Sequence, residues 1–171
     1  MAILTIRHAP DPVLSAPTRP VTTVTPEIRQ LVRDMIDTMY AASGVGLSAN
    51  QVGHPIQLFV ASADQVRGRE IVLVNPEILI RRGRVRLEEG CLSLPGIMTV
   101  VTRAAQVRVR GLTLDGTSCE VDGQELPARI FQHEIDHLHG LLFVNRLSWW
   151  RRTRLMRRYQ QQQRELTRVA L

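Results

Sequence analysis

The sequence predicts a single α+β domain with mostly antiparallel strands around one central helix and a further helix at the C-terminus. The chain has 171 residues, of which 44% are apolar and 22% charged, a size and composition typical of one globular domain. A helical pattern comes first, a run of strand patterns follows, and two helical patterns end the chain, the order of an α+β fold. No internal repeat or long linker divides it.

The first helix begins after Thr25. This capping threonine, Pro26 at the first helical position and Glu27 in the first turn form a strong start signal. Apolar residues then recur at helical spacing as far as about Ala42, namely Ile28, Leu31, Val32, Met35, Ile36 and Met39. The segment "SGVGLSANQVGHP" (43–55) breaks the pattern, which predicts a shaped loop.

The middle of the chain carries the strand patterns. Apolar or alternating segments predict strands at 56–62, 70–80, 84–88 and 105–114. Asn75-Pro76 is expected to interrupt the second of these, because proline cannot donate to a strand ladder. A turn over 115–123 is expected to lead into another strand.

Two helices are predicted to close the fold. The first runs from Leu126 to His139 and ends at Gly140, and Ser148 caps the last one. We expect residues 1–147 to form a catalytic domain, and 148–171 to be an arginine-rich helix of the same domain.

The composition predicts a cytoplasmic protein. No apolar run approaches the roughly 18 residues needed to cross a membrane, and "MAILTIRHAPDPV" has too short an apolar stretch for a secretory signal. A disulfide between Cys91 and Cys119 is disfavoured in that compartment, so each cysteine is a buried small hydrophobe or a working thiol. We also expect a monomer.

The net charge of +6 is located in the C-terminal segment. Residues 149–171 hold seven arginines and one acid, whereas the preceding 148 residues hold 15 arginines and 15 acids, and the chain contains no lysine. Two interpretations stay open for the segment: a solvated helix face, or a surface for an anionic partner.

The segment "FQHEIDHLHG" (131–140) holds three of the five histidines. On a helix, His133 and His137 project from the same face, where two imidazoles can bind one metal ion with Glu134 beside an open coordination position. The alternative is a solvated polar face. His139 falls on another side of the helix and is expected at the surface or behind the ligands.

A third ligand is offered by "EEGCLSLPG" (88–96), where a bare backbone at Gly90 would let Cys91 come close to an ion. Two imidazoles and one thiolate leave a fourth position for water, the pattern of a catalytic site. From these residues alone, Cys91 is either this ligand or a packed thiol.

The glycine loop "GVGLSANQ" (44–51) has three interpretations. It matches a dinucleotide-binding turn, but that turn leaves a strand and opens a helix, the reverse of the order here. Gly44 and Gly46 could be turn formers only. In the functional interpretation the loop offers backbone groups to an extended peptide, and Gln51 donates an amide N–H to a developing oxyanion.

Together the three segments resemble peptide deformylase, whose pattern is a G-Φ-G-Φ-A-A-x-Q loop, E-G-C-Φ-S and H-E-x-D-H. This sequence reads Gly44–Gln51, Glu89–Ser93 and His133–His137 at those places. The similarity extends to about residue 147. It implies metal-dependent hydrolysis that removes the N-formyl group from the formylmethionine of nascent peptides.

The resemblance also implies roles for single residues. Cys91, His133 and His137 would bind the metal, Glu134 would be the acid and base, and Gln51 with the Leu92 N–H would form the oxyanion hole. The methionine pocket and peptide-binding loop would involve Val45, Gly46, Leu87, Leu126 and Ile130. Supporting positions behind the ligands would be Glu89, Arg103, Gln132 and Asp136. Fe²⁺ is the implied native ion, and Zn²⁺, Ni²⁺ or Co²⁺ could substitute.

Three positions depart from the family pattern. Ser48 replaces the usual first alanine and adds one hydroxyl group. Met98 stands where many bacterial members have a longer basic residue, which concerns the choice of peptide. Arg129 is charged in a stretch that is often apolar, and we expect it to point outward.

The resemblance favours a ribosomal partner for the C-terminal segment. Nascent formylated chains leave a ribosome, so ribosomal RNA is the expected anionic partner, bound through Arg151, Arg152, Arg154, Arg157 and Arg158. No membrane partner is expected, because the segment lacks a clear apolar face. A zinc peptidase and a non-catalytic ribosome binder are the rival functions. The first seldom has an upstream cysteine ligand, and the second needs no complete catalytic set.

Overall fold

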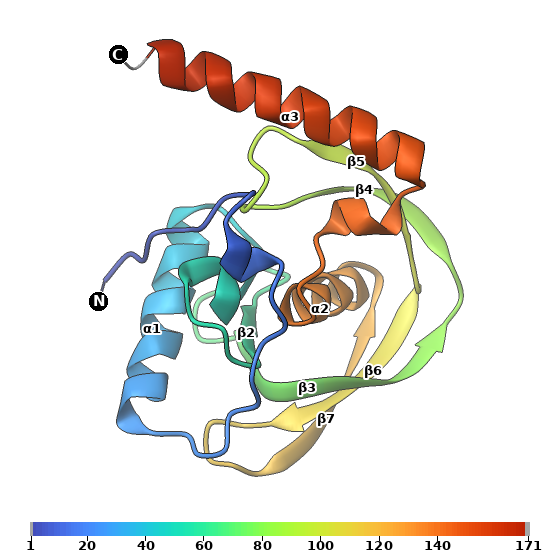
Figure 1. The fold of residues 1–171 in the computed structure, drawn as a ribbon. Coiled ribbons are helices and arrows are strands. Elements are labelled where there is room, and N and C mark those ends of the chain that lie inside the picture. Colours follow the sequence, from blue (N-terminus) through green and yellow to red (C-terminus); the bar gives the residue numbers. More distant parts are fainter. Residues whose placement is uncertain (1, 170–171) are drawn as a thin grey trace.

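The computed structural model describes residues 2–169 and shows how the elements are arranged (Figure 1). In chain order these are η1 (Pro12–Leu14), α1 (Pro26–Ala41), β1 (Gly46–Ser48), η2 (Ala49–Val52), β2 (Leu58–Ala61), β3 (Ile71–Arg82), β4 (Val85–Gly90), β5 (Met98–Arg103), β6 (Gln106–Leu112), β7 (Ser118–Gln124), α2 (Glu125–Leu138), η3 (Phe143–Arg146) and α3 (Trp149–Val169). The η elements are single 3₁₀ turns.

The strands form two antiparallel sheets. The larger has the order β1-β2-β3-β6-β7, and β4 pairs with β5 alone; we call this pair the β4–β5 ribbon (Val85–Arg103). The predicted α+β class with mostly antiparallel strands is therefore confirmed. β1 and β5 were not predicted, and β7 begins inside the segment expected to be a turn (115–123).

Helix α2 lies between the five-stranded sheet and the ribbon (Figure 1). Its apolar face packs against the sheet, where Phe131 meets Phe59 with 6.0 Å between ring centroids. β7 approaches this helix so closely that a Cβ on Gly123 would lie 2.9 Å from the Phe131 ring and 3.0 Å from the Ala128 nitrogen. The helix begins at Glu125 and ends at Leu138, within one residue of its predicted bounds.

Helix α1 follows its sequence signals. Thr25 adopts an extended cap conformation, its side chain accepts from the Ile28 N–H at 3.5 Å, and Pro26 is the first helical residue. Met35 and Met39 are fully buried against the glycine loop side of the core. The loop itself contains β1 and η2, short elements without enough residues to show a period.

Helix α3 is docked on the body through one face. Tyr159 is 1% exposed, and its hydroxyl donates to the carbonyl of Ala9 at 3.1 Å. Leu155 and Met156 pack against the same apolar cluster. Trp149 and Trp150 are 64% and 77% exposed, so the aromatic residues of the segment divide between docking and surface. In the part of the chain that the structure describes, no helix has the length and apolar character needed to span a membrane.

The expected interruption at Asn75-Pro76 is confirmed in the strand pairing but not in the strand itself. β3 continues through both residues, and its pairing with β6 shifts register between Val74 and Glu77. Asn75 has a φ of 51°, a region that asparagine tolerates better than most residues. Its side chain accepts from the Val21 N–H and donates to the Val21 carbonyl, both at 2.8 Å. The irregular residue thus ties the N-terminal segment to the sheet.

This clamp predicts a stability loss on replacing Asn75 by alanine. Two backbone groups of Val21 would lose their partners, and alanine would have to keep a positive φ, so the free energy of unfolding should fall by about 2–4 kcal/mol. Urea denaturation at fixed metal concentration measures the change. Asn75→Gly relieves the φ strain but does not restore the two hydrogen bonds, and should recover only a minor part. An unchanged urea midpoint in both variants would contradict the clamp.

Candidate metal centre and active site

Three predicted ligands lie together at the centre of the molecule. One donor atom each from Cys91, His133 and His137 falls within 4.8 Å of the others. His133 and His137 are one helical turn apart on α2, and Cys91 follows β4 in a tight turn in which the Leu94 N–H donates to the Cys91 carbonyl at 3.0 Å. The structure thus brings together residues that are 46 positions apart in the sequence.

The distances between the donor atoms suit a metal ion. Nε2 of His137 lies 3.1 Å from the Cys91 sulfur and 3.2 Å from Nε2 of His133. Metal–nitrogen bonds of about 2.0–2.1 Å at a tetrahedral ion would place two nitrogens about 3.3 Å apart. The thiolate and imidazole donors fit zinc and the divalent ions of iron, cobalt and nickel. The residues present therefore fit a single divalent metal.

A chain of buried charges orients His133. Glu89 Oε1 lies 2.6 Å from Nδ1 of His133, and Arg103 donates to both Glu89 oxygens, at 2.6 and 3.1 Å. Arg103 also pairs with Asp136, which pairs in turn with Arg146. The carboxylate at Nδ1 leaves Nε2 free to face the other ligands, the usual arrangement behind a metal-binding histidine.

The electrostatics of the centre favour a cation among the ligands. Burial lowers the pKa of His133, but its interactions with Cys91 and Glu89 outweigh burial and raise that pKa well above its ordinary value. The pKa of His137 is lowered well below its ordinary value by burial and by the neighbouring His133. Burial acts to raise the pKa of Glu89, but His133 and Arg103 hold it at about 2, so Glu89 is ionised under all ordinary conditions.

Glu134 is a buried carboxylate beside the ligands. It is 3% exposed, and Oε2 accepts from the Ser48 hydroxyl at 2.6 Å. Burial raises its pKa, while His133 and the Ser48 hydrogen bond act in the opposite direction. A Cβ on Gly46 would lie 2.4 Å from Oε1 of Glu134, so only glycine fits at this point of the loop. The hydroxyl of Ser48, expected to be a minor change, contacts the candidate base directly.

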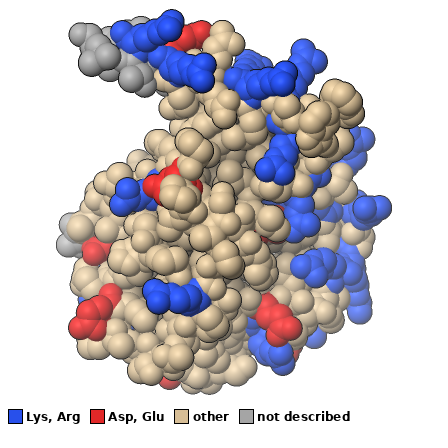
Figure 2. Space-filling view, viewed as in Figure 1, with Lys and Arg blue, Asp and Glu red and all other residues tan. Residues whose placement is uncertain are grey.

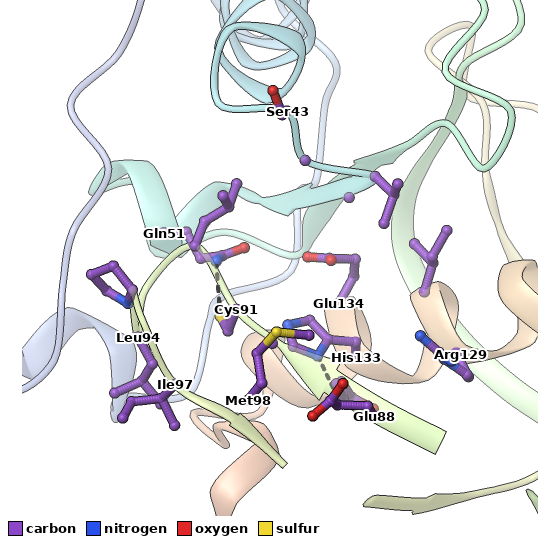
Figure 3. A pocket seen from close by; sticks show the side chains of 18 of the residues that line it. Ser43, Gln51, Glu88, Cys91, Leu94, Ile97, Met98, Arg129, His133 and Glu134 are labelled. Carbon is purple, nitrogen blue, oxygen red and sulfur yellow. Dashed lines mark hydrogen bonds and ion pairs between the residues drawn. The ribbon is translucent and has the colours of Figure 1, made fainter. Parts of the chain in front are cut away.

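Gln51 is held with its amide N–H groups toward the ligands. Its Oε1 accepts from the Ser48 N–H at 2.9 Å, which assigns the amide orientation, and Nε2 faces the Cys91 sulfur at 3.6 Å and Ser93 Oγ at 3.1 Å. Gln51, Cys91 and Glu134 face the same cavity (Figure 3). The glycine loop is thus packed against α2 and the ligands, which excludes its interpretation as a free dinucleotide-binding turn.

These side chains line a cavity of about 520 Å³. Predicted substrate-contacting residues that line it are Val45, Gly46, Leu92, Leu126 and Ile130. Leu87 does not; it lies on β4 and is 41% exposed. Met98 lines the mouth and is 60% exposed.

The outward orientation expected for Arg129 is wrong. Arg129 lines the cavity, and its Nε is buried without a hydrogen-bond partner among the described residues (Figure 3). Nothing in the local sequence distinguishes an arginine on the solvent side of α2 from one on the cavity side, because the burial pattern there depends on the facing loop.

The remaining supporting residues act through the backbone. Gln132 accepts from the Ala104 N–H and donates to the Ala104 carbonyl, both at 3.0 Å, which ties α2 to the β5–β6 connection. Asn50 donates to the carbonyl of His137 at 2.6 Å, an interaction that sequence reasoning missed. His139 is exposed, in agreement with the surface position expected for it.

The fold and this arrangement of candidate ligands and candidate base are those of a metal-dependent hydrolase. The family model of polypeptide deformylase matches residues 3–153. The chain therefore belongs to the polypeptide deformylase family.

Similar proteins cover almost the whole chain. The peptide deformylase of Acidobacterium capsulatum is 49% identical over 166 residues, 96% of this chain and 98% of that protein. The peptide deformylase of Nitrosococcus oceani is 44% identical over 164 residues, again 96% and 98%. A crystal structure of a peptide deformylase from Legionella pneumophila has a TM-score of 0.92 at 41% identity, over 98% of this chain and 99% of that one. One from Ehrlichia chaffeensis in complex with actinonin has a TM-score of 0.88 at 36% identity, over 96% and 99%.

The buried charges predict unequal roles for Arg103 and Arg146. Arg103→Gln would leave Glu89 and Asp136 without their shared cation, which should cost about 3–5 kcal/mol of stability and about 10–100-fold in metal affinity. Arg146→Gln is the matched control: its side chain is 45% exposed and contacts the same Asp136, so about 0–1 kcal/mol is expected. Urea denaturation and competition with a metal chelator measure the two effects. Equal losses in the two variants would contradict the central position of Arg103.

Proposed function

We propose that this chain removes the formyl group from the N-terminal formylmethionine of newly made polypeptides and releases formate. The observation that carries the proposal is the position of Glu134, a buried carboxylate with a raised pKa, beside the Cys91, His133 and His137 donor atoms in an open cavity. Membership of the deformylase family agrees with this reaction. The proposed ligands are those three residues, and the proposed acid and base is Glu134.

The reaction would involve three atoms or molecules in turn: the attacking water, the formyl oxygen, and the methionine nitrogen that leaves. When bound, the metal ion supplies Lewis acidity, which lowers the pKa of water and polarises the formyl carbonyl. Glu134 takes the proton from the attacking water and returns it to the departing methionine nitrogen as the C–N bond breaks. A raised pKa suits a carboxylate that must hold and release a proton near neutral pH.

The oxyanion and the methionine side chain would be bound by separate parts of the site. We propose that the Gln51 amide and the Leu92 N–H donate to the developing negative charge on the formyl oxygen. The orientation of Gln51, fixed by the Ser48 N–H, supports this role. Val45, Leu126 and Ile130 would contact the methionine side chain, and Gly46 would offer its backbone to the peptide. Leu87 has the weakest support of the proposed pocket residues.

We propose Fe²⁺ as the resident ion, with Zn²⁺, Ni²⁺ or Co²⁺ able to substitute. The Cys91 thiolate and two imidazoles suit all four ions. A ferrous ion beside an oxidisable thiolate would make the protein sensitive to air. Metal analysis of protein purified anaerobically tests the choice of ion, because anaerobic handling preserves both the ion and the thiolate.

Replacing Glu134 with glutamine tests the proposed base without removing a proposed metal ligand. Glutamine keeps the size of the side chain and can accept the Ser48 hydrogen bond, but it cannot carry a proton, so formate release from a formyl-methionyl peptide should fall about 10²- to 10⁴-fold. Metal content should stay at one ion per chain. Glu125→Gln, the same change at an exposed position of α2, is the control. A fully active Glu134→Gln protein, or cleavage of internal peptide bonds by the native chain, would refute the proposal.

We further propose that the chain is a cytoplasmic monomer that binds the ribosome through α3. Residues 1–147 would form the catalytic domain, and 148–171 would be part of the same unit. The exposure of Arg151, Arg152, Arg154, Arg157 and Arg158 supports an anionic partner, while Tyr159 anchors the opposite side of the helix. RNA is the densest source of phosphate at the site where formylated chains emerge.

Replacing these five arginines with glutamine should weaken ribosome binding and make it less sensitive to salt. Glutamine has nearly the helix propensity of arginine, so α3 stays docked through Tyr159, whereas deletion of residues 149–171 would remove that anchor. The slope of log affinity against log salt concentration should become smaller by about 0.7–0.9 for each phosphate that is no longer bound. Sedimentation with purified 70S ribosomes measures it. Binding equal to that of the native chain at every salt concentration would rule out this use of α3.

A further inference from the structure

A second group of arginines lies where the chain passes from the large sheet to the ribbon. Arg81 and Arg82 end β3, Gly83 forms the turn, and Arg84 and Arg86 lie at the start of β4. All four arginines are exposed. We call residues 81–86 the basic turn. It carries four positive charges and no acid.

The basic turn shows that charge is unevenly distributed over residues 1–148, although their net charge is zero. Residues 1–148 hold 15 arginines and 15 acids, which leaves 11 arginines against 15 acids outside the turn. The body is therefore neutral only on average, because a positive region at one place is balanced by acids elsewhere.

Ion pairing distinguishes these arginines from eight other arginines of the chain. Arginines paired with an acid are Arg7, Arg29, Arg67, Arg69, Arg103, Arg108, Arg110 and Arg146. Among the described residues, no acid lies within 4.0 Å of a guanidinium nitrogen of the basic turn or of the five α3 arginines. Nine arginines without an acidic partner within 4.0 Å thus lie in these two segments, although Arg19, Arg33 and Arg129 elsewhere in the described chain also lack one.

The ribbon places the two segments next to each other. Arg86 lies opposite Thr102 in the ladder, and Arg151 of α3 donates to Thr99 Oγ1 at 3.4 Å. Thr99 and Thr102 are three residues apart on β5, about 10 Å along an antiparallel strand. That is about one Debye length at 0.1 M salt. Thr99 and Thr102 point to opposite faces of the ribbon, so a partner that contacts both groups has to pass over the edge of the ribbon. Figure 2 shows arginines over the start of α3 and down the adjacent edge of the body, toward the basic turn.

Two exposed aromatic rings lie at the junction. Trp149 and Trp150 begin α3, and their rings meet edge to face with 4.5 Å between centroids. They are 64% and 77% exposed, although burying rings of this size would lower the free energy of the protein. Arginines beside exposed aromatic rings suit a partner with both phosphates and bases, since guanidinium groups bind phosphate and rings stack on bases.

We propose that the basic turn and the first turns of α3 form one RNA-binding surface, with the ribbon between them. The proposal extends the ribosome binding proposed above, on which it rests, to a part of the body outside α3. The turn arginines would bind the phosphate backbone without reading sequence, and Trp149 and Trp150 would stack on unpaired bases. An anionic membrane surface is less suited, because the arginines outnumber the apolar groups and the two rings lack a continuous apolar face.

A variant with Arg81, Arg82, Arg84 and Arg86 replaced by glutamine tests the surface. Its control carries glutamine at Arg29, Arg69, Arg108 and Arg110, whose side chains are between 41% and 72% exposed and are paired with acids. Both variants have the same net charge, so only the place of the charge differs. The five-arginine α3 variant is measured beside them. The probes are purified 70S ribosomes, protein-free 23S ribosomal RNA, and vesicles with one third anionic lipid. Thermal unfolding checks the fold of each variant.

The turn variant should bind ribosomes and free RNA about 10-fold or more weakly at 0.1 M salt, and its salt slope should be smaller by about 1.5, the effect expected when two phosphates are no longer bound. The control should bind like the native chain. Equal weakening of turn and control variants, or a turn variant with native affinity and slope, would overturn the proposal. If the α3 variant loses binding while the turn variant binds like the native chain, α3 acts without the turn and the shared surface is refuted. If native protein binds only the vesicles, both RNA proposals fail.

Discussion

The ion pair between Arg103 and Glu89 holds the candidate metal centre in place. Arg103 is on β5, Glu89 on β4, and the third member, Asp136, on α2. Glu89 also contacts Nδ1 of His133 at 2.6 Å, so one carboxylate both neutralises the arginine and orients a ligand. With Arg103 and Glu89 side chains only 3% and 7% exposed, each charge depends on the others for its compensation. The ribbon is thereby fixed on α2, and Cys91, directly after β4, is brought to the two histidines.

Close packing of the glycine loop on α2 extends this constraint to the proposed base and the proposed oxyanion donor. Gly46 admits the Glu134 carboxylate where any Cβ would collide. Two residues later, the Ser48 hydroxyl contacts that carboxylate and the Ser48 N–H fixes Gln51. One three-residue strand, β1, therefore positions both the proposed base, Glu134, and the proposed oxyanion donor, Gln51. Its pairing with β2 supplies the rigidity, since a loop without such support could not hold both groups against the ligands.

The sequence predicted features that depend on local spacing and left out those that depend on distant partners. α1 and α2 followed from capping residues and helical periodicity, and His133 and His137 from their spacing of four. β5 was missed because its pattern has meaning only when paired with β4. The interruption expected at Asn75-Pro76 affects only the pairing with β6, because the clamp on Val21 keeps the irregular residues in the strand. The orientation of Arg129 was wrong because the loop that faces it comes from a remote part of the chain.

The two faces of the β4–β5 ribbon contact different parts of the molecule. Alternate residues of a strand point to opposite faces, and Met98 and Glu88 line the mouth of the cavity, whereas Val101 is buried under the cluster that holds Tyr159 of α3. The ribbon is therefore shared by the cleft and by the helix that carries the unpaired arginines. In the proposed complex, RNA held at the basic turn and α3 would fix the direction of the ribbon, and with it the direction in which the cleft opens. A substrate delivered from the same RNA surface would then meet the cavity mouth without a hinge, because the rigid element between the two sites is also part of each of them.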